Sequence, residues 1–206
     1  RELGAATVGL IGMPPAARSM SQLLGAFGSK VVGYDPSLHA SDTVWERWRV
    51  RPMGLRELLE SSDAVCVQLA YFSRYQGLLG DRFLPYCKPH QVIVSTAHSA
   101  LFDEKALADV LASGRVAAAW LDSLEPGALD SGRPLAGIST LQITYFVAYN
   151  SNPRGTYLWH CGNAVIKVDQ HIELDATRQC IIDLIKADLS SRFGGDHDVV
   201  ISNWKL

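Results

Sequence analysis

Residues 7–35 hold the glycines, prolines and acidic group whose spacing is best suited to chemistry. A short apolar run, Val8–Ile11, ends in Gly12 and is followed by a helical pattern, and a second apolar run, Val31–Tyr34, ends in Asp35. This order is typical of a strand–helix–strand unit that binds a dinucleotide, in which glycines let the backbone approach the diphosphate. A carboxylate after the second strand then binds a ribose hydroxyl.

The glycine pattern of this unit is incomplete. An intact pattern has glycine at positions 12, 14 and 17, whereas this chain has Gly12, Pro14 and Ala17. Pro14 adds a ring and removes an N–H donor, and Ala17 is a milder change. Asp35 favours NAD over NADP, although it could also simply cap the loop before Pro36. We therefore expect NAD(H) as the cofactor if one binds, with Pro14 opposing that binding.

The positions of the chemical groups depend on short apolar runs that alternate with helical segments. Such alternation predicts an α/β fold, with a Rossmann-like, doubly wound parallel sheet and helices on both faces. The predicted strands are Thr7–Ile11, Val31–Tyr34, Val50–Pro52, Ala64–Leu69, Val92–Ser95, Val116–Leu121 and Thr140–Thr144.

The helical segments differ in their patterns. Ala16–Phe27 places five residues on one apolar helical face, namely Ala17, Met20, Leu23, Leu24 and Phe27. Asp103–Ala112 is a second clear helix, with Leu107, Val110 and Leu111 facing inward. We expect residues 1–149 to form the dinucleotide-binding-type domain and residues 150–206 a C-terminal helical extension. That extension contains an amphipathic helix at 174–193, a stretch at 156–172 that could be helix or strand, and a short strand at 199–201.

Composition narrows the range of partners. The formal net charge is −2 and the apolar runs have the length of strands, which argues against nucleic-acid binding and against a membrane span. The four cysteines lack metal-ligand spacing, so we expect buried free thiols, no metal site and a cytoplasmic, reducing compartment. His160 beside Cys161 does not make a ligand set either. Because the chain opens with Arg1 at the edge of a strand, we expect it to be part of a longer polypeptide.

Five stretches stand out by their order and spacing: VGLIG (8–12), AFGSKVVGYDP (26–36), LLESSDAV (58–65), CKPHQVIVSTAHSALFDEKAL (87–107) and SGRVAAAWLDSLEP (113–126). Together they resemble the D-2-hydroxyacid dehydrogenases, a family that includes the C-terminal-binding-protein branch of transcriptional co-repressors. The segments YDPSL and FDEKALA are most similar to that co-repressor branch.

The resemblance also assigns roles to positions, and three catalytic positions depart from the family pattern. The arginine that clamps the substrate carboxylate corresponds to His98, the carboxylate that tunes the catalytic histidine to Gly127, and that histidine to Phe146. A histidine lacks the bidentate fork of arginine, and phenylalanine transfers no proton. The resemblance further places Ala97 against the cofactor and Asp122 at the nicotinamide amide, although Asp122 could equally be a solvated strand-end carboxylate.

Two functions follow as expectations, beside a third alternative in which the chain binds a nucleotide-like ligand without a diphosphate contact, or is a subunit to which another chain supplies the N-terminal half of the substrate domain. The first is a catalytically degenerate dehydrogenase-like protein that uses its Rossmann-like domain for dimerisation or for binding a protein partner. The second is an active NAD-dependent oxidoreductase acting on a 2-hydroxy or 2-keto acid, with His98 as a rebuilt acid/base and Tyr145 or Tyr149 assisting. The resemblance also implies a homodimer, and identifies the helix at 174–193 as the remnant of a substrate domain.

Overall fold

The computed structural model divides into two compact units, residues 1–141 and 142–206, which are described one at a time. The structure describes residues 2–122, 124–125, 127–128, 130–153, 160–168, 183, 186 and 197–205.

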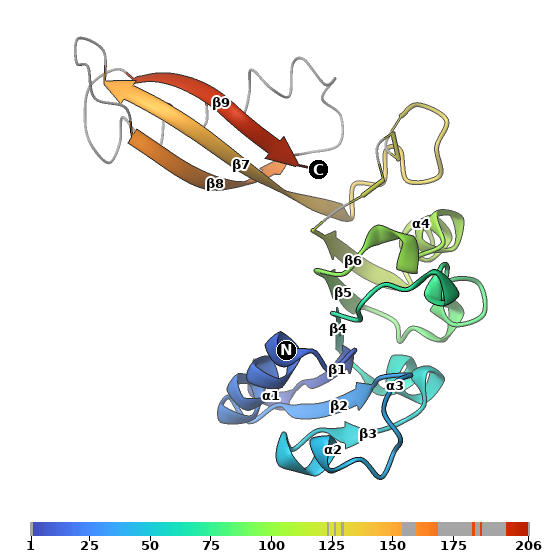
Figure 1. The fold of residues 1–206 in the computed structure, drawn as a ribbon. Helices are drawn as coiled ribbons and strands as arrows, with labels where there is room; N and C mark the ends of the chain where they lie inside the picture. The colour runs from blue at the N-terminus through green and yellow to red at the C-terminus, as the bar shows by residue number, and fades with distance from the viewer. Residues whose placement is uncertain are drawn as a thin grey trace. The chain divides into compact units, whose positions relative to one another are not determined.

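The first unit contains six parallel strands in the order β3-β2-β1-β4-β5-β6 (Figure 1). This order confirms the predicted α/β fold with a doubly wound parallel sheet. The strands are β1 (Thr7–Ile11), β2 (Lys30–Tyr34), β3 (Arg51–Pro52), β4 (Ala64–Val67), β5 (Gln91–Ser95) and β6 (Val116–Leu121).

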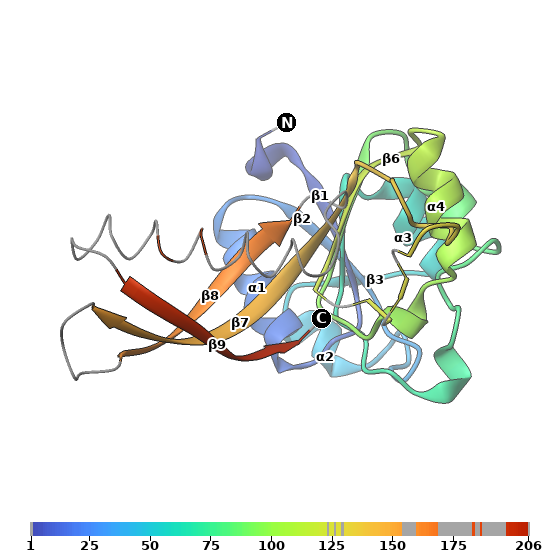
Figure 2. The ribbon, with the colours of Figure 1, turned by 90° about the horizontal axis from the view of Figure 1, so that it is seen from above.

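Helices cover both faces of this sheet. Because the sheet grows from β1 in two directions, right-handed crossovers place the connecting helices on opposite faces. Accordingly, α1 and α2 lie on one face and α3 and α4 on the other (Figure 2). The helices are α1 (Pro15–Ala26), α2 (Thr43–Arg47), α3 (Leu55–Ser61) and α4 (Glu104–Ala112), with short 3-10 turns η1 (Leu3–Ala5), η2 (Ser73–Tyr75), η3 (Leu84–Tyr86) and η4 (Ser99–Leu101).

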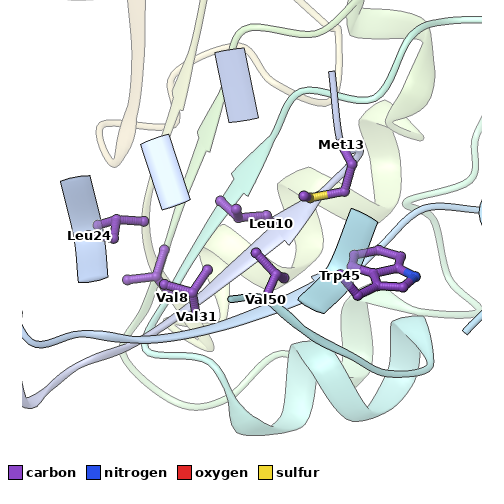
Figure 3. Packing of buried hydrophobic residues seen from close by; sticks show 7 residues of the cluster. All are labelled: Val8, Leu10, Met13, Leu24, Val31, Trp45 and Val50. Carbon is purple, nitrogen blue, oxygen red and sulfur yellow. The ribbon is translucent and has the colours of Figure 1, made fainter. Parts of the chain in front are cut away.

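One apolar cluster joins α1 and α2 to the sheet. Alternate residues of a strand face the same side, so Val8 and Leu10 of β1 both point toward this layer. Burial of these side chains supplies the main driving force that holds the layer on the sheet. Figure 3 shows the seven buried members, which are Val8, Leu10, Met13, Leu24, Val31, Trp45 and Val50.

The apolar face predicted for α1 is partly wrong. Leu23 and Phe27 are each 64% exposed, whereas Ala17, Ser21 and Leu24 are buried. The buried residues follow the spacing i, i+4, i+7, and Leu23 lies about 100° around the helix from Leu24. Ser21 can be buried because its hydroxyl hydrogen-bonds to the carbonyl oxygens of Arg18 and Trp48 at 2.7 and 3.1 Å.

The second unit is built on antiparallel strands. Its central strand β7 (Leu141–Pro153) pairs with β8 (His160–Val168) and with β9 (His197–Lys205). The strand predicted at 140–144 is therefore longer, and the ambiguous stretch at 156–172 contains a strand. Asp183 and Lys186 are helical, but the rest of the helix predicted at 174–193 lies outside the described residues and stays a prediction.

Membrane-spanning helices and metal clusters are both absent from the described residues. In that part of the chain, no helix combines the length and apolar character that crossing a bilayer requires. Nor do its His, Cys, Asp and Glu residues form any group of three or more that could hold a metal ion.

Two buried free thiols should make the folding stability of the first unit decrease at alkaline pH. Burial raises the pKa of Cys66 to about 11 and that of Cys87 to about 12 from 9.0, with Arg115 opposing the second shift. As pH rises, the thiols ionise first in the unfolded chain, where their pKa is 9.0. The contribution of each neutral thiol to folding stability is therefore fully present below pH 9.0 and decreases above it by about 1.4 kcal/mol per pH unit.

We therefore expect the urea midpoint of unfolding to fall between about pH 8 and about pH 10, and Cys87→Ala to shrink that fall. The cavity that this substitution leaves lowers stability equally at both pH values, so the difference between them isolates ionisation. If the urea midpoint fell by the same amount in Cys87→Ala, the raised pKa of Cys87 would be contradicted. The predictions for Cys161 and Cys180 concern side chains outside the described residues.

Candidate functional site

The carboxyl ends of the parallel strands bring the predicted site residues of the first unit to one edge of the sheet. Gly12 follows β1, Asp35 follows β2 and Gln68 follows β4. His98 follows β5 by three residues, and Asp122 follows β6 directly. In doubly wound sheets this edge is where ligands bind, at the point where the strand order reverses.

Gly12 makes the tight turn that the sequence predicts. Its φ is +93°, and a Cβ built there would lie 2.5 Å from the Cα of Leu69 and 2.6 Å from its backbone nitrogen. The Gly12 N–H donates to the carbonyl oxygen of Tyr34 at 2.7 Å. The turn is therefore held between β2 and the chain leaving β4, with no room for a side chain.

The loop from Gly12 to α1 has few free donors. The Met13 N–H donates to Oδ2 of Asp35 at 2.8 Å, and Pro14 and Pro15 carry no N–H. In a helix that begins at Pro15, the N–H groups of Ala16 and Ala17 are those left without an intrahelical acceptor. Two consecutive prolines thus remove donors at the point where a dinucleotide fold presents them to phosphate.

Asp35 is engaged within the protein. Besides the Met13 bond, its Oδ1 accepts the N–H of Ser37 at 2.9 Å and the Ser37 hydroxyl at 2.6 Å. These contacts close the loop after β2, as the alternative interpretation of Asp35 expects, and its ribose role stays a prediction.

Taken residue by residue, this end of the site does not fit the diphosphate of NAD. Gly12 supplies the close turn, but Asp35 uses the Met13 N–H and the two prolines carry none, so only the N–H groups of Ala16 and Ala17 are left as backbone donors. Gln68 does not replace them: its Oε1 is buried without a hydrogen-bond partner, and its Nε2 lies 3.6 Å from the sulfur of Met20. An acceptor oxygen adds no donor for a phosphate.

At the other end of the edge, His98 lies against Glu125. The Nδ1 of His98 accepts the Ala100 N–H at 3.1 Å and lies 3.8 Å from Oε1 of Glu125. The same oxygen accepts the hydroxyl of Ser99 at 3.1 Å, and the ring of Tyr71 stacks on the imidazole at 4.6 Å between centroids. Because Nδ1 is an acceptor here, the proton of the neutral imidazole is on Nε2.

Ala97 and Asp122 are tied to this end through Ser95. The Ala97 N–H donates to the hydroxyl of Ser95 at 3.2 Å, and the Asp122 N–H donates to the Ser95 carbonyl oxygen at 2.9 Å. Ser95 is buried, so both hydrogen bonds are shielded from water. Tyr145 lies in β7 of the second unit, and its side chain is outside the described residues.

Sequence reasoning missed two partners of His98. Glu125 lies 27 residues away and follows β6, and Tyr71 comes from the loop after β4. The sequence indicated Glu125 only in that the segment LEPGAL has this one carboxylate. Beside this pair is a cavity of about 290 Å³, lined by Ser99, Ala100 and Glu125 and by apolar side chains that include Leu121 and Leu124.

The strand order and the glycine turn define the first unit as a dinucleotide-binding-type domain. Residues 1–148 match the family described as D-isomer specific 2-hydroxyacid dehydrogenase, NAD binding domain. The chain therefore belongs to this family.

Individual relatives agree with this assignment. The chain is 30% identical over 160 residues to (S)-sulfolactate dehydrogenase of Chromohalobacter salexigens, covering 76% of this chain and 52% of the relative. It is 35% identical over 121 residues to D-3-phosphoglycerate dehydrogenase of Mycobacterium bovis, covering 59% of this chain and 22% of the relative. The chain thus spans about half the length of the first relative and less of the second.

Solved structures show the same fold. The NAD-complexed D-isomer specific 2-hydroxyacid dehydrogenase of Lactobacillus delbrueckii matches with a TM-score of 0.56 and 26% identity, covering 65% of this chain and 40% of that one. The holo D-mandelate dehydrogenase of Rhodotorula graminis matches with a TM-score of 0.61 and 24% identity, covering 70% of this chain and 42% of that one.

Proposed function

We propose that this chain is a catalytically degenerate member of its family that uses the Rossmann-like domain for dimerisation or for binding a protein partner, a role implied by its resemblance to the co-repressor branch. The observation that carries the proposal is the loop after β1, where Met13 donates to Asp35 and the next two residues are prolines. A diphosphate at this loop would face two proline rings and few N–H donors. The replacements at His98, Gly127 and Phe146 add a second, independent reason.

Titration with NADH, followed by mixing with a panel of 2-keto acids, tests this proposal. We expect no binding heat, no thermal shift at millimolar cofactor and no turnover above background. Turnover that His98→Gln or Asp122→Asn abolishes would overturn the proposal.

The His98–Glu125 pair supports a second candidate, an active NAD-dependent oxidoreductase on a 2-hydroxy or 2-keto acid. The imidazole holds a proton on Nε2, half of its side chain is exposed, and Oε1 of Glu125 lies 3.8 Å from Nδ1. The adjoining cavity of about 290 Å³ does not add to this support, because Asp103, Glu104 and Glu125 line it and would repel a substrate carboxylate. The same NADH titration separates the two candidates, because an oxidoreductase must bind its cofactor.

Exposed apolar side chains around the end of α1 support a homodimer. Leu23 and Phe27 lie one helical turn apart, and Leu3, which is 44% exposed, is near them because a Cβ built on Gly4 would lie 2.7 Å from the carbonyl oxygen of Phe27. A second copy of the chain that packs its own patch on this one would remove these side chains from water.

We expect light scattering to give twice the 22.5 kDa chain mass, and Phe27→Asp to give the monomer, because a charge buried without a partner is unfavourable. The matched control is Phe72→Asp, since Phe72 is also exposed but lies in the loop after β4. A monomeric native chain at micromolar concentration would reject the homodimer. A Phe27→Asp dimer would place the interface elsewhere.

A further inference from the structure

A basic groove lies on the far side of the first unit from the edge that carries Asp35 and His98. It has a volume of about 640 Å³ and is formed by the C-terminal half of α1 and by the turn between α2 and β3. Ser29 and Arg49 line it just before β2 and β3, and these strands are parallel. The groove is therefore at the amino-terminal edge of the sheet and is separate from the dinucleotide-type site.

Arg49 has a backbone conformation that usually belongs to glycine. Its φ is +52°, and α2 ends in a Schellman motif, with the Arg49 N–H on the Glu46 carbonyl at 3.0 Å and the Val50 N–H on the Trp45 carbonyl at 2.9 Å. Glycine is the common residue at this position because a Cβ is disfavoured there. Glycine at position 49 would end α2 without strain. What arginine adds at this position, at the cost of that strain, is its guanidinium group.

The groove therefore contains two cationic groups and one aromatic ring. Arg47 and Arg49 are exposed, and among the described residues neither forms an ion pair. The Arg47 guanidinium lies 5.9 Å from the centroid of the Trp48 ring, and Trp48 also lines the groove. The buried hydroxyl of Ser21 binds the Trp48 carbonyl oxygen at 3.1 Å and so fixes this turn against α1.

From this geometry we infer that the groove between α1 and the α2–β3 turn binds a phosphate monoester carried on a planar ring. Two guanidinium groups without carboxylate partners match a group of about −1.5 to −2 charge, which a phosphate monoester has and a carboxylate lacks. Guanidinium and indole faces both stack on planar rings. The volume of about 640 Å³ lies within the usual range for small-molecule sites.

Calorimetric titration of the full chain with AMP, inorganic phosphate and adenosine tests this inference. We expect AMP to bind, inorganic phosphate to bind more weakly, and adenosine to give no measurable heat. Equal binding of AMP and adenosine would overturn the role of the arginines, and equal binding of AMP and phosphate would overturn the contact with a ring. Absence of AMP binding would overturn the site itself.

Two substitutions locate the ligand. Arg47→Gln and Arg49→Gly should each weaken AMP binding at least about tenfold, because each removes a charged hydrogen-bonding group. Arg49→Gly should at the same time raise the melting temperature by about 2–4 °C, because glycine relieves the strain, so lost binding could not be attributed to misfolding. Arg51→Gln, which removes an exposed arginine paired with Glu57, is the matched control and should bind AMP as the native chain does.

AMP could also enter the dinucleotide-type site, and Asp35→Ala distinguishes the two sites. The inference requires that this variant bind AMP normally. Loss of AMP binding in Asp35→Ala, with normal binding in Arg47→Gln and Arg49→Gly, would overturn it.

Discussion

Replacing Pro14 with glycine and Pro15 with alanine should create NADH binding, which we expect the native chain to lack. The double substitution returns two backbone N–H donors to the start of α1 and removes the ring beside Gly12. A hydrogen bond to a charged group contributes about 1.5–3 kcal/mol, so two of them should tighten binding by at least roughly 100-fold. Calorimetry or NADH fluorescence would measure the change.

The control for this prediction is Pro89→Ala, which changes a proline in the turn before β5, far along the chain from the loop. It should leave NADH binding at the level of the native chain. If the native chain already binds NADH as well as the double variant does, the two prolines are no obstacle and the degenerate assignment fails. If neither binds, the use of the Met13 N–H by Asp35 is the larger obstacle.

Gly12→Ala should cause a large loss of stability. The φ of +93° is disfavoured for alanine, at about 1–3 kcal/mol, and overlap with a packed neighbour adds about 1–3 kcal/mol. The neighbour is the backbone of Leu69 at 2.5 Å, which cannot move aside as a flexible side chain would. We expect the free energy of unfolding to fall by about 4 kcal/mol.

Gly25→Ala is the matched control for this substitution. Gly25 lies within α1, and a Cβ added there meets no atom within 4 Å. Alanine should therefore raise the stability by about 0.5–1 kcal/mol, because glycine is unfavourable inside a helix. Urea unfolding of the two variants would show opposite shifts, and a Gly12→Ala protein of native stability would mean that the turn is not as tight as described.

The sequence predicts elements well where local pattern and capping agree. In α4, the predicted inward residues Leu107, Val110 and Leu111 are buried, and Asp103 caps the helix by accepting the N–H of Ala106 at 2.9 Å. In α1 the same reasoning failed for Leu23 and Phe27, since the direction in which a helix meets its sheet depends on distant strands. Periodicity says that a helix has an apolar face, but not how much of it the sheet covers.

The contacts within the candidate site are even less predictable from the sequence than the packing of α1. The sequence predicts strands that end just before Gly12, Asp35 and His98, and the structure places these residues at one edge because the carboxyl ends of parallel strands coincide. The bond from Met13 to Asp35 joins residues 22 positions apart, and no local pattern predicts which amide a carboxylate will take. The contact between His98 and Glu125 likewise depends on the path of a loop.

The outermost strand of the first sheet has a bearing on how copies of the chain can associate. β3 contains only Arg51 and Pro52, and it pairs only with β2. A proline offers no amide to an incoming strand, and a two-residue border gives almost no template for one. A strand of another copy therefore cannot pair with β3 and extend the sheet, as happens in fibrils. Any self-association at this edge must proceed through helices or loops.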